Sequence, residues 1–501
     1  MRFTSLVIEL IRARPRLVVW IVVLVQAALW LIVTLPFYHA PPSDLALALA
    51  YGREYQVGSE LGPPLSFWLA DIAYRAAGNH MTGVYLLGGL CSVATFWILF
   101  LLGRALVGSQ HAVLAVLLTM TVTAFGASTL DFGPDVLARP LWALLLLHSW
   151  ELIGQRRRNV WFAWSIDAGL LLLTTPAALM LLVLVLGFAL ATAEGRRPLR
   201  SIDPLFALLV IVVLALPYLI FLLRADTLAL HWPLLADLKP RAIHWAWLFG
   251  GLLLAITGIL LLVVLNASWF SREGDDAPII YRPPVARLAR DFVYFFALAP
   301  VIAGSLLAAL FDLDRVTGGA GVVLMMSGLA VVVATGDLIH LRRQRLLRAV
   351  WALIVAAPAA GVVGATLFLP WTAANEIATS MPSRAIGEFF TDAFERRTNR
   401  RLIAVAGDTR IASLVALAPG RPHLLLDENP KASPWISQAG FNETGGVVVW
   451  RASDTAGTPP PDIARRFPGL VPEVPRSFDW LVNGRQPTLR IGWAIVRPKG
   501  Q

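Results

Sequence analysis

The sequence is poor in charged residues and in cysteine. Only 15% of its 501 residues are charged, whereas 57% are hydrophobic and the mean hydropathy is +0.68. Soluble proteins contain about 25% charged residues, so the deficit predicts a polytopic membrane protein. The single cysteine, Cys91, excludes an intramolecular disulfide and a metal cluster held by cysteines.

Common catalytic motifs are also missing. The sequence has no P-loop, no GxSxG, no HExxH and no internal repeat, and an ATP-driven pump is therefore unsupported. The glycine-rich stretches GVVGATLF and VTGGAGVV lie in apolar runs, where we expect them to serve helix packing. His39, His231 and His244 lie near predicted membrane surfaces, and interfacial packing is their expected role.

The net charge of +10 suggests nucleic-acid binding at first sight. Most of the basic residues, however, lie beside apolar segments, where the positive-inside rule accounts for them. We therefore expect no nucleic-acid partner.

Apolar runs long enough to cross about 30 Å of hydrocarbon occur along the first 370 residues. The first run is longer than the core of a signal peptide, so we expect a retained transmembrane helix. The run 161–192 is broken by Thr174-Thr175-Pro176 and is interpreted as two short spans, which gives about eleven in all. The other runs are 17–37, 82–102, 111–128, 135–153, 204–223, 243–265, 291–311, 318–338 and 349–369.

The distribution of basic residues predicts the orientation of these spans. With a cytoplasmic N-terminus, the cytoplasmic segments hold 19 basic residues and the outer segments before residue 370 hold six. An odd number of spans then places the C-terminal part outside. Residues 371–501 contain no span, and strand-like runs such as GGVVVW alternate there with the amphipathic stretch SRAIGEFFTDAFERRT, so we expect a small extracytoplasmic α/β domain. The predicted domains are therefore 1–370 and 371–501.

The first predicted outer loop, residues 38–79, contains two amphipathic stretches. SDLALALAYGREYQVG has a helical pattern, and PLSFWLADIAYRAAG begins at a proline and ends at Gly78, a residue typical of helix ends. Short helices with Tyr, Phe and Trp are expected to lie along the membrane interface. The Pro63-Pro64 pair would fix the corner between them.

The second outer loop, STLDFGPDVLARP, brings Asp131, Asp135 and Arg139 to the start of the fourth span. An acid close to hydrocarbon is costly and is therefore a candidate functional residue. Two interpretations of Asp135 stay open: a functional acid, or a helix cap with Arg139 as its i+4 partner. Asp131 is expected to be a solvated loop residue.

This arrangement resembles the C-type polytopic membrane glycosyltransferases, in particular family 39, which includes the protein O-mannosyltransferases and the lipid A aminoarabinose transferase type. That family has an acid early in the first outer loop, a Pro-Pro-Leu-aromatic motif before the second span, and a second acid after the third. The matching residues here are Asp44, the motif residues Pro63, Pro64, Leu65 and Trp68, then Asp135, and a later segment that begins at Trp161.

The resemblance implies transfer of a sugar from a polyprenyl-phosphate donor to a lipid, glycan or protein acceptor. Asp44 or Asp135 would take the proton of the acceptor hydroxyl, and cations would offset the charge of the departing phosphate. The implied location is the outer face of the bacterial inner membrane, with residues 371–501 in the periplasm. No cofactor and no protein metal cluster are expected, although a divalent cation that bridges Asp44 and the donor phosphate is compatible with the resemblance.

Three positions depart from the family pattern. Leu45 replaces a frequent second acid, Gly62 a basic residue before the prolines, and Thr175 a typical lysine. We expect arginines elsewhere to hold the donor phosphate. One alternative is a chain with altered activity that acts as a non-enzymatic assembly or binding protein; another is a secondary transporter, for which Asp167 is the one candidate acid. The candidate phosphate ligands are Arg139, Arg53 and Arg241.

Overall fold

The structure is a computed structural model that describes residues 3–59, 61–126, 131–224, 238–267, 279–282, 284–372, 376–426, 433–480, 482 and 484–498. The chain forms two compact units. Met1–Leu31 and Tyr85–Ala360 form the first, and Ile32–Val84 and Gly361–Gln501 form the second. The first loop thus packs with the C-terminal residues in one unit. The predicted domain boundary at residue 370 stays a prediction.

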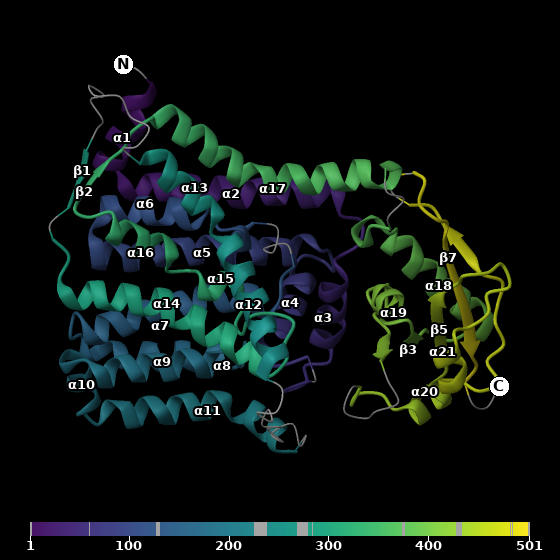
Figure 1. Ribbon diagram of the computed structural model, residues 1–501. Coiled ribbons are helices and arrows are strands. Elements are labelled where there is room, and N and C mark those ends of the chain that lie inside the picture. Colours follow the sequence, from purple (N-terminus) through teal and green to yellow (C-terminus); the bar gives the residue numbers. More distant parts are fainter. Residues whose placement is uncertain are drawn as a thin grey trace. The chain divides into compact units, whose positions relative to one another are not determined.

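The first unit is a bundle of apolar helices that run alongside one another (Figure 1). Helix α8 packs against α7 and α11, α14 packs against α9 and α12, and α6 packs against α16. Helices satisfy their own backbone hydrogen bonds, as the interior of a membrane requires. The bounds are α1 (Phe3–Ala13), α2 (Pro15–Phe37), α5 (Thr82–Val107), α6 (Ser109–Thr119), α7 (Pro134–Ile153), α8 (Trp161–Leu172), α9 (Ala178–Ala191), α10 (Ala193–Leu199), α11 (Asp203–Arg224), α12 (Leu238–Ala255), α13 (Thr257–Asn266), α14 (Arg287–Leu310), α15 (Ala320–Val323), α16 (Ser327–Ala334) and α17 (Gln344–Thr372).

Among the described residues, six helices are long and apolar enough to cross a membrane: α2, α5, α7, α11, α14 and α17. The number rises to eight if the bent pairs α9–α10 and α12–α13 each form one span. Two shorter apolar stretches, Ser109–Thr119 and Ala320–Ala334, coincide with further predicted runs. A multi-pass membrane protein is confirmed, and the count of about eleven stays a prediction.

The predicted break in 161–192 is present. Helix α8 ends at Leu172 and α9 begins at Ala178. The Thr174 hydroxyl donates to the Leu170 carbonyl at 2.8 Å, and the Thr175 hydroxyl accepts from the Ala177 backbone N–H at 3.3 Å. Side-chain hydroxyl groups thereby satisfy backbone groups that the interrupted helix would leave without partners.

The second unit contains a five-stranded mixed sheet with the strand order β4-β3-β5-β7-β6. Strand β3 runs parallel to β4 and β5, whereas β7 runs antiparallel to β5 and β6. The strands are β3 (Ala404–Gly407), β4 (His423–Leu425), β5 (Gly446–Arg451), β6 (Arg476–Phe478) and β7 (Leu489–Val496). A separate two-stranded ribbon in the first unit joins β1 (Ile279–Tyr281) to β2 (Leu338–His340).

Both faces of the five-stranded sheet are covered. On one face, α18 (Ser383–Thr398), α19 (Thr409–Val415) and α3 of the first loop (Ser43–Arg53) share one apolar core, in which Ala46, Ala50 and Phe390 are buried. On the other face, α20 (Gln438–Thr444) and α21 (Pro461–Arg466) contribute Phe441 and Ile463 to a second core. The first loop is therefore built into the C-terminal α/β fold.

Candidate functional site

Asp44 lies exposed in the first turn of α3. No side-chain hydrogen bond caps this end of the helix, because the N-cap residue is Pro42. The carboxylate is thus available for chemistry, and the helix dipole favours a negative charge there. The next residue, Leu45, is only 1% exposed. An acid at position 45 would be buried in the core, which explains the first departure from the family pattern.

The corner between α3 and α4 (Leu65–Ala76) is a tight backbone structure. Ser59 and Gly62 exchange two backbone hydrogen bonds, of 3.0 and 3.3 Å, and Gly62 has φ +122°. This conformation favours glycine over the basic residue of the family pattern. Pro63 and Pro64 follow as buried residues, and the Trp68 indole donates to the Gln56 carbonyl at 3.1 Å. These contacts hold the corner in which the proline pair lies, and the role predicted for the two prolines stays a prediction.

Helices α3 and α4 also approach each other closely. A Cβ on Gly52 would lie 2.2 Å from the Phe67 carbonyl oxygen, so only glycine fits there. Helix α4 ends in a Schellman motif. Gly78 has φ +72° and its N–H donates to the Arg75 backbone carbonyl, while the Asn79 N–H donates to the Tyr74 backbone carbonyl. The predicted role of Gly78 as a helix terminator is confirmed.

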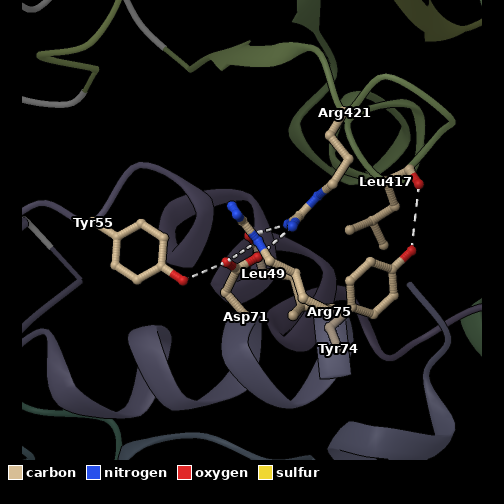
Figure 2. A network of polar contacts seen from close by, with 7 residues as sticks. All are labelled: Leu49, Tyr55, Asp71, Tyr74, Arg75, Leu417 and Arg421. Atoms are coloured by element: carbon tan, nitrogen blue, oxygen red, sulfur yellow. Dashed lines mark hydrogen bonds and ion pairs between the residues drawn. The ribbon is translucent and has the colours of Figure 1, made fainter. Parts of the chain in front are cut away.

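Figure 2 shows a buried polar network centred on Asp71 of α4, a carboxylate with no exposed surface. Arg421, between α19 and β4, donates from Nη1 to Oδ1 of Asp71. The Tyr55 hydroxyl donates to Oδ2 at 2.9 Å, and Arg75 Nε lies 2.7 Å from the same oxygen. Three donors thus compensate the charge that burial would otherwise make costly.

Arg421 also connects the network to α3 and α4. Its Nη2 donates to the Leu49 carbonyl at 3.0 Å, and its guanidinium lies 5.1 Å from the centre of the Tyr74 ring. Burial raises the pKa of Tyr74, and burial together with the Asp71 hydrogen bond raises the pKa of Tyr55, so both phenols stay neutral. One arginine therefore holds two loop helices against the α/β fold.

Arg53 ends α3 beside this network. Burial lowers the pKa of its guanidinium, with nearby Arg421 and Arg75 adding to the effect and Glu54 opposing it. Within the described residues, its Nη1 atom is buried without a hydrogen-bond partner. The neighbouring Glu54 pairs instead with Nδ1 of His423 at 2.7 Å. Arg53 therefore keeps a donor that an anionic ligand could satisfy.

The Asp71 network was not predicted from the sequence, although the spacing of the residues in α4 indicates that Asp71 is buried. Residues Phe67, Ala70, Asp71 and Tyr74 follow helical spacing, and all four are buried. An acid on the apolar face of an amphipathic helix predicts a buried partner. No pattern indicated that this partner is Arg421.

In the first unit, Asp135 lies exposed in the first turn of α7. Gly133 is the N-cap residue and no side chain caps the helix, so the interpretation of Asp135 as a helix cap is wrong. Arg139, one turn further, is 5% exposed and lies 5.4 Å from the centre of the Phe125 ring. Whether either residue acts on a ligand stays a prediction.

The glycine-rich segment VTGGAGVV lies over these two side chains. A Cβ on Gly319 would lie 3.1 Å from the carboxylate carbon of Asp135, and one on Gly321 would lie 2.8 Å from Nε of Arg139. Gly318 and Gly319 have φ of +88° and +77°, which favours glycine at both positions. The segment was expected to serve helix packing; it forms in addition a turn that closes on Asp135.

The remaining candidates are more scattered. Arg241 lies half-buried near the start of α12, and no hydrogen bond or ion pair in the described part of the chain links it to Asp135 or Arg139. Asp167, the candidate acid of the transporter interpretation, bonds to Nδ1 of His148 at 2.5 Å. Asp44 and Arg53 belong to the second unit, as do the motif residues Pro63, Pro64 and Trp68, whereas Asp135, Arg139, Arg241 and Asp167 belong to the first.

Among the described residues, no three His, Cys, Asp or Glu side chains form a group that could hold a metal ion. A magnesium ion often binds one or two carboxylates together with substrate phosphates. The exposed carboxylate of Asp44 fits that type of site, so a bridging cation stays a prediction.

Comparison with known proteins adds the following. Residues 62–221 match the family model of dolichyl-phosphate-mannose-protein mannosyltransferase. The chain is similar to the crystal structure of ArnT from Cupriavidus metallidurans bound to undecaprenyl phosphate, with a TM-score of 0.60 and 13% identity over 96% of this chain and 98% of that one. The apo state of ArnT gives a TM-score of 0.62 at 13% identity, over 96% and 97% of the two chains. No curated protein matches the chain by sequence.

At 13% identity these structures show the fold, and the family-model match adds a sequence signal across the Pro63-Pro64 motif and Asp135. The protein has the fold of the C-type polytopic membrane glycosyltransferases, and the resemblance to their family 39 that its motifs indicated is confirmed.

Proposed function

We propose that the chain is a membrane glycosyltransferase that moves a sugar from a polyprenyl-phosphate donor to a lipid, glycan or protein acceptor. The family model describes a transferase that uses a lipid-phosphate sugar, and the similar ArnT structure contains undecaprenyl phosphate. The proposed site of action is the outer face of the bacterial inner membrane. The N-terminus is then cytoplasmic and residues 371–501 are periplasmic.

One observation carries the proposal: a single fixed helix presents both an acid and a cation. Helix α3 has the exposed Asp44 in its first turn and the half-buried Arg53 at its last residue. The contact between Gly52 and α4 and the bond from Arg421 to Leu49 hold the helix in place. Held this way, the two groups keep a constant position relative to each other, and preorganised positioning is a large part of catalysis.

In the proposed reaction, Asp44 acts as the general base. The acceptor hydroxyl oxygen attacks the anomeric carbon, the bond from that carbon to the phosphate oxygen breaks, and the phosphate keeps the bonding electrons. Asp44 takes the proton of the hydroxyl group. The donor leaves as polyprenyl phosphate with one more negative charge, which needs a positively charged site.

The charges around Arg53 suit that requirement. Two carboxylates oppose three guanidinium groups there, which leaves a positive excess of one before His423 is counted. The carboxylate of Asp71 is already paired with Arg421, Arg75 and Tyr55, so it does not compete with a bound anion for Arg53. We propose Arg53 as a phosphate ligand, with Arg139 and Arg241 of the first unit as further candidates and Asp135 as a second acid.

Binding of undecaprenyl phosphate to the purified full chain tests the donor class. We expect Arg53→Gln and Arg139→Gln each to weaken binding about 10- to 100-fold, because a hydrogen bond to a charged group contributes about 1.5–3 kcal/mol. Arg384→Gln is the matched control, since its exposed guanidinium pairs with Glu388 on the surface of α18. Melting curves of the same samples separate lost binding from lost folding. A wild-type chain that does not bind the lipid contradicts the proposal.

The non-enzymatic alternative rests on Gly62 and Thr175, which replace typical cations of the family. Their structural roles are now visible: Gly62 adopts a glycine conformation and Thr175 supports the break before α9. These roles support the proposal, because they give both residues a structural reason. Undecaprenyl phosphate bound without any sugar transfer would favour the alternative.

A further inference from the structure

A carboxylate–histidine pair joins the end of α3 to the start of β4. Oε1 of Glu54, the residue that follows α3, lies 2.7 Å from Nδ1 of His423, the first residue of the strand. The Glu54 side chain is 7% exposed and the His423 side chain 31%, so the acid is nearly buried and the ring is partly open. Both residues belong to the second unit, as do Asp44 and Arg53. Neither is assigned a step in the proposed transfer.

The pair leaves one ring nitrogen of His423 available. Nδ1 is engaged by the carboxylate, whereas Nε2 has no hydrogen-bond partner among the described residues and is not a buried atom. A carboxylate beside one ring nitrogen fixes the orientation of the imidazole and favours its protonated form. Because histidine changes its charge between about pH 5 and 8, Nε2 can donate a proton near neutral pH. These are the properties that a general acid requires.

Two other histidine–acid pairs occur in the described part of the chain, and each has a different setting. His244 pairs with Asp312, whose side chain is 94% exposed, so that acid stays in solvent. His148 pairs with Asp167 in the first unit, where α7 packs against α8. The Glu54–His423 pair combines a nearly buried acid with a partly open ring, and Glu54 follows directly on the proposed phosphate ligand Arg53.

The surroundings of the pair suit a group that acts on an anion. The titratable and charged groups around it are Arg53 of α3, Tyr55 shortly after it, Asp71, Tyr74 and Arg75 of α4, and Arg421 before β4. Asp71 is paired with three donors, so Glu54 is the carboxylate that faces the imidazole. A departing phosphate beside Arg53 would therefore lie near the available ring nitrogen.

We infer that His423 is the general acid of the transfer and that Glu54 is its positioning residue, an inference that rests on the proposed function. When the bond between the anomeric carbon and the phosphate oxygen breaks, its electron pair stays on the phosphate. The protonated ring of His423 gives the proton on Nε2 to this phosphate, while Asp44 takes the proton of the acceptor hydroxyl. The phosphate leaves as a singly protonated ester, the ring becomes neutral, and exchange with solvent restores both groups.

The chemistry of the leaving group explains why a histidine suits this step. The donor is a phosphate diester with one negative charge, and its phosphate becomes a monoester that gains a second. The second pKa of a phosphate monoester is about 6, within the range in which histidine exchanges protons. An arginine stays charged and offers only hydrogen bonds. Arg53 and His423 therefore have different roles, since one binds the phosphate and the other protonates it.

The pH profile of the transfer tests the inference. The assay follows release of undecaprenyl phosphate from a sugar-linked donor by the full chain, over the range of about pH 5–8 in which histidine changes charge. A general base and a general acid together give a bell-shaped profile. His423→Asn should lose at least about a hundredfold in kcat, and its rate should no longer fall toward the alkaline end. Arg53→Gln should instead mainly raise KM for the donor.

The choice of variants separates catalysis from folding. Asparagine keeps an amide N–H in the place of Nδ1, so the hydrogen bond to Glu54 can persist while Nε2 is lost. Glu54→Gln removes the charge that favours the protonated ring, so its rate should begin to fall at a lower pH than in wild type. His80→Asn is the matched control, because this exposed ring contacts Thr82 outside the pair and should leave rate and profile unchanged.

The possible outcomes distinguish the inference from the proposed function. If the pair only holds α3 to β4, His423→Asn lowers the melting temperature and leaves the pH profile of the remaining activity unchanged, and this result overturns the inference. A wild-type rate and profile in His423→Asn would overturn it as well, with the proposed transfer intact. A wild-type chain that releases no undecaprenyl phosphate contradicts the proposed function and the inference together.

Discussion

Replacing Arg421 by glutamine removes the cation that faces the buried Asp71. The change also weakens the bond to the Leu49 carbonyl and removes the cation near the Tyr74 ring. Removing one partner of a buried ion pair costs about 3–5 kcal/mol, because the other charge stays buried. Asp71 keeps two donors, Arg75 and Tyr55, so the expected loss is near the lower end, about 3 kcal/mol.

Thermal unfolding followed by tryptophan fluorescence measures this loss. A unit of roughly 150–250 residues loses about 2–4 °C of melting temperature per kcal/mol, so Arg421→Gln should lower the transition of the second unit by about 6–12 °C. Arg384→Gln is the matched control. It breaks an exposed i,i+4 pair with Glu388, which should contribute less than about 1 kcal/mol.

A double-mutant cycle separates the Arg421–Asp71 pair from the other contacts of each residue. Asp71→Asn removes the buried charge, so adding it to Arg421→Gln should cost less than the sum of the two single changes. The reasoning is refuted if Arg421→Gln lowers the melting temperature no more than Arg384→Gln does. Strictly additive effects of the two network changes would refute it as well.

Three further predictions concern the first loop and the topology. Gly62→Ala should destabilise the chain by about 1–3 kcal/mol through backbone strain alone, because no atom lies within 4 Å of the added Cβ; an unchanged melting temperature would contradict the +122° conformation. In a Cys91→Ser background, Ser453→Cys should react with an impermeant thiol reagent in bacterial cells with a permeable outer membrane and Arg157→Cys should not; both positions are exposed, and the reverse labelling would overturn the proposed orientation. Finally, the raised pKa of Tyr55 means that the fold favours the protonated phenol. The contribution of this phenol to stability is complete below its pKa in the unfolded chain, about 10, and is lost as the pH rises through its pKa in the folded chain. When the pH is raised above 10, the melting temperature of Tyr55→Phe should therefore fall less than that of the wild type. Equal falls in melting temperature would count against the prediction.

Several parts of the fold could be predicted because their signals are local. The amphipathic stretch 383–398 coincides with α18, and the Thr174-Thr175-Pro176 sequence falls in the break between α8 and α9. Gly78 adopts the left-handed conformation expected of a helix terminator. In each case neighbouring residues alone determine the backbone conformation.

The packing of the first loop could not be predicted in the same way. Ala46 and Ala50 are small residues that give no sign of their partners, yet they belong to one core with Phe390 of α18. The Asp71–Arg421 pair joins residues 350 positions apart in the sequence. Contacts at such separation depend on the tertiary fold, whereas the pattern of one helix shows only that a buried acid needs some partner.

The most direct test of the proposed function is sugar transfer by the Asp44→Asn variant. The assay follows release of undecaprenyl phosphate from a sugar-linked undecaprenyl-phosphate donor, with a cell-envelope extract as the acceptor. General-base catalysis contributes about 10²–10⁴-fold, so Asp44→Asn should lose at least about a hundredfold in rate while its melting temperature and its binding of undecaprenyl phosphate stay as in wild type. Asp462→Asn, which changes an exposed acid on α21, should transfer normally. Wild-type rates of release by Asp44→Asn would contradict the account.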